Sequence, residues 1–174
     1  MTSNTYMGDR DPRFVTRRRG GLLEEEPHHL LALWAAACAE RVLPLFQSAC
    51  PDDSRPEDAI GTARQWAAGK VAMMVAREHA FAAHAAARSA GGAASDAARA
   101  AGHAVATAHM ADHELGAAFY ALKALRKAHP DDEERFRIER AWQLSILPEQ
   151  ISALVIDDMR IRARKFQGLL HLPA

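Results

Sequence analysis

Apolar residues recur every three or four positions from about residue 28 onward, which is the spacing of one face of an α-helix. Pro44 lies inside the first such stretch and has no amide proton, so we expect the helix to bend there. Cys50 and Pro51 mark its end. The apolar positions of this first helix are Leu30, Leu31, Trp34, Cys38, Val42, Leu45 and Phe46.

The stretch after the loop CPDDSRP carries the signals of a second helix start. Ser54 and Glu57 have the spacing of a capping box, in which each side chain satisfies a free amide at the helix start. Pro56 is tolerated there because the first-turn amides have no helical partner. Gly69 is expected to end the helix. The expected buried positions are Ile60, Ala63, Trp66 and Ala67.

Three further helices are expected at about residues 71–90, 95–110 and 115–128. Gly91-Gly92 separates the first two, and His129-Pro130 ends the third, because Gly and Pro interrupt helices. About one residue in five is alanine, the best helix former. Small side chains let helix axes approach closely, so we expect tight helix packing at an alanine stripe. That stripe is Ala82, Ala83, Ala86 and Ala87.

Two last helices complete the pattern. Asp131 or Asp132 is expected to cap the sixth, and Pro148 to open the seventh. Their expected buried positions are Phe136, Ile138, Trp142, Ile146, Ile151, Leu154, Val155, Met159 and Ile161.

No segment has the pattern of a core strand, so the sequence predicts an all-α, single-domain bundle of about seven helices over residues 22–168. Residues 1–21 are expected to form a polar arm that is partly disordered or holds a short extended segment turning at Gly20-Gly21. Residues 169–174 are expected to form a tail. Arg17, Arg18 and Arg19 in the arm could bind nucleic acid, but a solvated arm is the favoured interpretation.

Composition narrows the function classes. Acidic and basic residues number 22 each, whereas duplex-binding domains usually have a basic excess, so nucleic acid is not the expected partner. No apolar run has the length of a membrane span, and no secretion signal is recognisable. Cys38 and Cys50 fit a reducing cytoplasm, where we expect the protein, although a disulfide between them is an open alternative.

Five of the nine histidines gather in the middle of the chain, near Asp112. They could form a metal site of a metal-dependent hydrolase, but H-x-x-D-H is not the zincin pattern. We favour histidines that cap helices or bond to backbone carbonyls. No nucleophile elbow and no phosphate-binding loop is present, so we predict no enzyme and no cofactor. The five histidines are His79, His84, His103, His109 and His113.

Asp157 and Asp158 lie in the middle of the predicted seventh helix, in LVIDDMRIR, although Asp is a poor helix former. Arg160, Arg162 and Arg164 follow closely. We favour a buried or interfacial salt bridge for this pair, with a binding site as the alternative.

Four blocks appear in an order that resembles a bacterial family of immunity proteins from polymorphic toxin systems, over roughly residues 13–165. They are LLALWAAACAERVLPLF, RPEDAIGTARQWAAGKVAMM, AAGHAVATAHMADHELGAAFYALKALRKA and AWQLSILPEQISALVIDDMRIR. The resemblance implies a small cytoplasmic α-helical protein that binds and blocks a cognate toxin without catalysing a reaction.

The resemblance supplies no site residues, so candidates for toxin binding come from residue type alone. The alternatives to an immunity protein are the metal-dependent hydrolase and a helical regulatory or interaction module that forms homodimers. The candidate binding residues are Arg55, Arg64, Tyr120, Asp157, Asp158 and Arg160.

Overall fold

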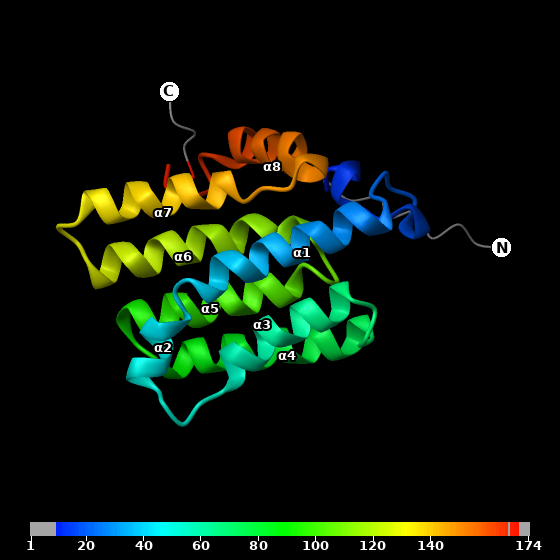
Figure 1. The fold of residues 1–174 in the computed structure, drawn as a ribbon. Helices are drawn as coiled ribbons and strands as arrows, with labels where there is room; N and C mark the ends of the chain where they lie inside the picture. The colour runs from blue at the N-terminus through cyan, green and yellow to red at the C-terminus, as the bar shows by residue number, and fades with distance from the viewer. Residues whose placement is uncertain (1–9, 167, 171–174) are drawn as a thin grey trace.

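Helices make up the body of the molecule in the computed structural model, which describes residues 10–166 and 168–170 (Figure 1). This part of the chain forms eight α-helices and no strand, which confirms the predicted all-α class. The helices are α1 Glu25–Glu40, α2 Leu43–Ala49, α3 Arg55–Ala67, α4 Met73–Ser89, α5 Gly92–Ala106, α6 Glu114–Ala128, α7 Glu133–Ser145 and α8 Glu149–Arg162. Three short 3-10 helices are η1 Pro12–Phe14, η2 Arg17–Arg19 and η3 Ala111–His113.

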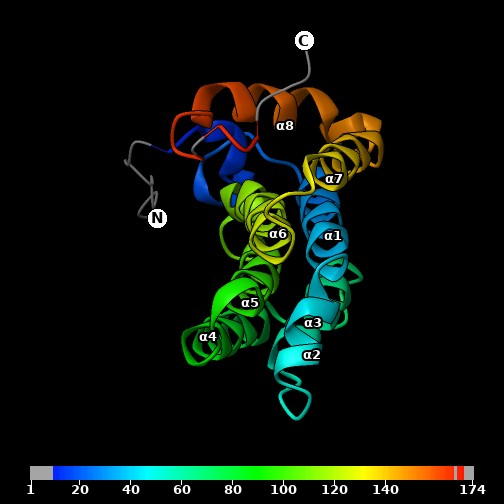
Figure 2. The same cartoon turned by 90° about the vertical axis from the view of Figure 1, so that its left-hand side faces the viewer.

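The helices form two layers (Figure 2). α4, α5 and α6 lie side by side in one layer, and α1, α2, α3 and α7 form the other. α5 is central and contacts α1, α2, α3, α4 and α6. α8 lies across one edge, next to the N-terminal segment (Figures 1 and 2).

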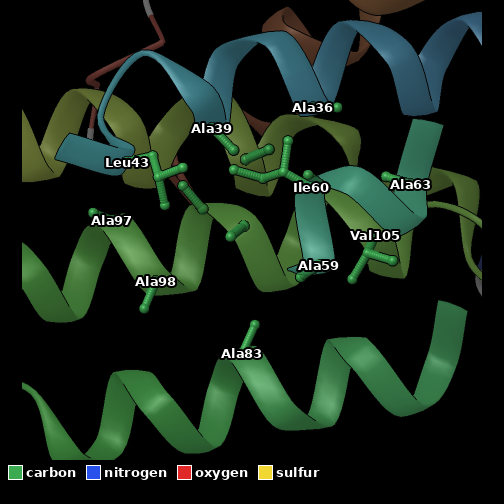
Figure 3. Packing of buried hydrophobic residues seen from close by; sticks show 14 of the residues in the cluster. Ala36, Ala39, Leu43, Ala59, Ile60, Ala63, Ala83, Ala97, Ala98 and Val105 are labelled. Carbon is green, nitrogen blue, oxygen red and sulfur yellow. The ribbon is translucent and has the colours of Figure 1, made fainter. Parts of the chain in front are cut away.

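Two hydrophobic cores hold the layers together. The first is rich in alanine and is formed by all six helices from α1 through α6. Ile60 and Val105 are among its few larger side chains (Figure 3). Ala83, Ala86 and Ala87 of the predicted stripe are buried there, on α4. The second core holds larger side chains and joins α1, α6 and α8 to the N-terminal segment. Its fully buried members include Leu31, Leu115, Leu122, Ile151 and Met159.

Pro44 divides the predicted first helix into two, which accounts for an eighth helix. α1 ends at Glu40, and Pro44 lies in the first turn of α2, where its missing amide proton leaves no bond unmade. The two helices are bent by 47° to each other. In the described residues no single helix is long and apolar enough to cross a membrane, whereas α1 and α2 meet that criterion only as this bent pair.

The predicted capping box at Ser54 is wrong. The Ser54 hydroxyl donates to Asp58 Oδ2 (2.8 Å), and Ser54 itself has helical backbone angles. Asp53, one residue earlier, accepts the Arg55 amide proton through Oδ1 (3.2 Å). Two other predicted helix ends are confirmed: Gly69 has φ +70° after α3, and Asp132 accepts the Arg135 amide proton (2.9 Å) at the start of α7. The helix predicted at about residues 95–110 instead spans Gly92–Ala106.

Two of the predicted buried residues are exposed: Ile138 on α7 (55%) and Ile161 on α8 (63%). α7 instead buries three polar residues, one of which, Arg140, bonds to Met159 of α8 and to the Leu170 carbonyl. The backbone carbonyl of Gln143 accepts the indole proton of Trp34 (2.8 Å), and its Nε2 donates to the Ala118 carbonyl (3.2 Å). These two bonds pair the indole N–H of Trp34 and the side-chain N–H of Gln143, whereas Oε1 of Gln143 and Oε1 of Glu139 have no hydrogen-bond partner in the described structure. The three residues are Glu139, Arg140 and Gln143.

The segment before α1 is packed from residue 10 onward, within the span where we predicted a polar arm that is partly disordered or holds a short extended segment turning at Gly20-Gly21. Phe14 and Val15 are buried, and the chain turns back at Gly20 so that the Leu23 amide donates to the Val15 carbonyl (2.9 Å). Leu170, in the predicted tail, is also buried, and its carbonyl accepts from Arg140 (3.0 Å). Residues 1–9 and 171–174 lie outside the described part of the chain.

Candidate functional site

A cleft of about 820 Å³ lies beneath the N-terminal segment. This segment forms one side, the start of α1 and the end of α3 form another, and the connection between α5 and α6 closes the third. Four arginines and two glutamates are the charged residues that line it, and its apolar lining includes Phe14, Val15 and Leu23. The arginines are Arg10, Arg17, Arg18 and Arg19, and the glutamates are Glu24 and Glu25.

A tight turn places the arginines of η2 at the rim of this cleft. Gly20 has φ +87°, a left-handed conformation that favours glycine. A Cβ on Gly21 would lie 2.0 Å from the Val15 carbonyl oxygen, so a larger residue cannot occupy that position without moving the backbone. The Gly21 amide donates to the Thr16 carbonyl (3.1 Å) and closes the turn.

Trp66, near the end of α3, forms an aromatic wall of the cleft. The rings of His28 and His29 meet it edge-on, with centroids 4.7 and 4.9 Å away. His28 Nε2 lies 2.7 Å from the Thr107 carbonyl oxygen, which only accepts, so Nε2 carries the proton and donates it. Burial lowers the pKa of His28, which keeps the ring neutral.

The arginines of the cleft differ in their partners. Arg17 pairs with Glu24, and Arg10 pairs with Asp112 (2.6 Å). Arg18 and Arg19 are exposed, and neither has a carboxylate partner within residues 10–166 and 168–170. The cleft therefore presents unneutralised positive charge beside an aromatic and apolar surface.

The structure brings four of the five predicted histidines into a chain. Ring centroids are 5.2 Å apart for His84–His103, 5.1 Å for His103–His113 and 5.7 Å for His109–His113. Two glycines make the space: a Cβ on Gly102 would meet the His84 ring at 2.7 Å, and one on Gly116 would meet His103 Nδ1 at 2.4 Å. The two glycines are visible in the sequence, but their spacing alone does not identify the side chains that pack against them.

The Nδ1 atoms of His103 and His113 lie 3.1 Å apart, so one donates a proton and the other accepts it. Tyr120 stacks on His103 at 5.2 Å. Burial lowers the pKa of His103 to about 3 and that of His113 to about 4. Both rings are therefore neutral near pH 7 and act as packed, hydrogen-bonded side chains.

This arrangement differs from the metal site that the sequence left open as an alternative. Among the residues described here, no group of three or more His, Cys, Asp or Glu side chains is placed to hold a metal ion. Asp112 is engaged by Arg10, through hydrogen bonds from Nε (3.2 Å) and Nη2 (2.6 Å). His79 lies earlier on α4 and makes no ring contact with the other four histidines in the described structure.

The favoured salt bridge at Asp157-Asp158 is confirmed. Asp158 is 4% exposed and pairs with Arg162, whose Nη2 also lies 3.3 Å from Oε1 of the fully buried Glu114. Burial raises the pKa of Glu114. Asp157 accepts from Arg13 (2.6 Å), a partner 144 positions away that sequence spacing could not reveal.

The other candidate binding residues are spread over the surface rather than gathered. Arg55 pairs with Asp53 (2.6 Å), and Arg64 makes two bonds to Glu40 (2.7 and 2.6 Å), both from α3. Arg160 is exposed on α8, which lies at the opposite edge of the molecule from α3 (Figure 2). These residues therefore do not form a single patch.

Comparison with known protein families identifies one match. The family described as "Imm-5 like putative immunity protein" matches residues 21–150, from the turn before α1 to the start of α8. No curated protein and no solved structure matches the chain. Because the match covers most of the sequence, the chain belongs to this family.

Proposed function

From its membership of the Imm-5 like immunity family, we propose that the protein binds a cognate toxin and neutralises it by protein–protein association. The family match over residues 21–150 carries this proposal. An immunity protein acts by occupying a surface that the toxin needs, so its function requires binding residues on a rigid scaffold rather than a reacting group. The packed helices and the fixed turn of the N-terminal segment supply such a scaffold.

The surface offers the residue types that dominate protein interfaces. A stable interface buries about 1,600 Å² in total, and a few Trp, Tyr and Arg side chains carry most of its energy. The cleft combines Trp66 with Arg18 and Arg19. Arg160 is the most accessible candidate contact, because it is exposed whereas the others are part-buried. The other candidates are Arg55, Arg64, Tyr120 and Asp157. Asp158 is buried, so we expect it to support the fold.

The test begins with a pull-down of the tagged protein from its native host, followed by mass spectrometry. We expect one stoichiometric partner with a toxin-like C-terminal domain. That domain is then expressed in a sensitive strain with and without the wild-type protein. Growth rescue together with a 1:1 complex in size-exclusion chromatography is the expected result. A toxin domain that neither forms this complex nor is silenced by co-expression would overturn the proposal.

A further inference from the structure

We propose that the cleft beneath the N-terminal segment receives an acidic segment of the toxin, with its carboxylates on Arg18 and Arg19 and a neighbouring apolar side chain against Trp66. This inference rests on the proposed function and names the surface that performs it. The negative charge of an acidic segment complements the positive charge of Arg18 and Arg19 in the cleft.

Arg18 and Arg19 differ from many other arginines of this chain in having no carboxylate partner in the described structure. Acidic and basic residues balance at 22 each, and many arginines bind carboxylates of the same chain. Arg13, Arg41 and Arg162, for example, pair with Asp157, Glu139 and Asp158. The cleft departs from this balance: once Arg10 pairs with Asp112 and Arg17 with Glu24, Arg18 and Arg19 remain against the one carboxylate of Glu25. Arg18 and Arg19 are thus positioned for carboxylates supplied from outside.

The walls of the cleft strengthen this attraction. Fields from like charges are focused in a concave site with apolar walls, where fewer water molecules screen them. Phe14, Val15 and Leu23 are buried and line the same cleft as the arginines, and so does the Trp66 ring. A volume of about 820 Å³ is large enough for several side chains. An acidic segment with one apolar residue matches both the arginines and the apolar side chains that line the cleft.

A second observation concerns His109, which lines the same cleft. Its Nδ1 atom is buried and has no hydrogen-bond partner within the described part of the chain. Because the protein itself covers this nitrogen, His109 contributes its ring surface to the cleft rather than a hydrogen bond to the occupant. Burial also lowers the pKa of His109, which favours the neutral ring, so the positive charge of the cleft comes from its arginines.

Hydrogen bonds fix the backbone of the turn that carries the arginines. The Gly20 amide donates to the Arg17 carbonyl (2.9 Å), and the Arg19 amide donates to the Thr16 carbonyl (2.8 Å). The turn therefore loses little backbone entropy on binding, which favours affinity.

The test compares two charge reversals in the full-length protein against the toxin domain that the wild type captures. Arg18→Glu/Arg19→Glu alters the cleft. Arg135→Glu/Arg137→Glu makes the same change in net charge on exposed residues of α7, at the opposite end of the molecule (Figure 1). Because all four side chains are exposed, both variants are expected to fold, which circular dichroism and thermal unfolding verify.

At about 0.05 M salt we expect the cleft variant to raise the dissociation constant about 100-fold, largely through a slower association rate, and the control to change it less than about threefold. A photo-crosslinking residue at Leu22, beside the cleft and exposed, should capture a peptide of the toxin rich in Asp or Glu.

The outcomes separate the two proposals. If the wild type binds no toxin domain, the proposed function fails and this inference fails with it. If the wild type binds and the cleft variant binds equally well, only this inference is overturned. It is also overturned if Leu22 crosslinks to a non-acidic peptide or to a second copy of the chain, or if the cleft binds a single-stranded oligonucleotide in place of the toxin.

Discussion

Replacing Gly116 with alanine tests whether the histidine chain is tightly packed. A Cβ at this position of α6 would lie 2.4 Å from His103 Nδ1 and 2.6 Å from Cγ. The His103 ring cannot easily move aside, because Tyr120 stacks on it and His113 is bonded to Nδ1 at 3.1 Å. The substitution must therefore push the ring out of place or shift α6 away from α5.

Two opposing terms set the size of the effect. Overpacking a filled core costs about 1–3 kcal/mol. Alanine inside a helix gains about 0.5–1 kcal/mol over glycine. Gly61 in α3 isolates the second term, because a Cβ there meets nothing within 4 Å. We expect Gly116→Ala to lower the free energy of unfolding by about 1 kcal/mol, and Gly61→Ala to raise it by about 0.5–1 kcal/mol.

Urea unfolding followed by circular dichroism at pH 7.5 measures both variants, and a change of 1 kcal/mol corresponds to about 2–4 °C in Tm for a chain of this size. In a His103→Ala background the clash is removed, so Gly116→Ala should become neutral or stabilising. Equal stability of Gly116→Ala and Gly61→Ala in the wild-type background would refute the packing argument.

Two further predictions concern buried ionisable groups. Stability should fall as the pH drops from about 6.5 toward 4, because the unfolded chain binds protons on His103 and His113 while the folded pKa values are about 3 and about 4. The expected loss at pH 5 is about 2 kcal/mol per group, measured by urea unfolding at pH 7.5 and 5.0, and an unchanged midpoint would contradict it. Arg162→Met should destabilise the fold by about 3 kcal/mol, because it leaves buried Asp158 without its cation, whereas the exposed neighbour change Arg160→Met should stay within about 0.5 kcal/mol. Similar denaturation midpoints for these two variants would show that the ion pair contributes little.

The helices could be predicted from the sequence because their signals are local. Apolar spacing, Gly69 and Asp132 each act within a few residues, and the structure bears them out. The predicted cap at Ser54 is wrong because two local signals compete. Asp53 lies one residue away and offers a stronger acceptor for the Arg55 amide. The apolar spacing also predicts that Ile138 is buried, whereas it is exposed. Spacing alone does not show that α7 turns its polar face toward hydrogen-bonding partners in the interior.

The cleft was less predictable because its walls come from distant parts of the chain. The arginine run was visible as a candidate, but the facing Trp66 lies far along the sequence and reads as an ordinary helix residue. Only the fold brings that ring against His28 and beneath the N-terminal turn. The sequence likewise shows that the histidines are close along the chain, but it does not predict the contacts between their rings and the glycines. Those contacts depend on the packing of α4, α5 and α6.

Burial assigns different roles to the two kinds of basic side chain at the cleft. Desolvation lowers the pKa of His28 and His109, so their rings contribute shape but no charge near pH 7. The positive charge comes from arginines, whose guanidinium groups do not lose their protons in this range. The electrostatic attraction of the cleft weakens with salt because Arg18 and Arg19 are exposed. A binding surface built in this way keeps its charge while the buried histidines preserve the packing beneath it.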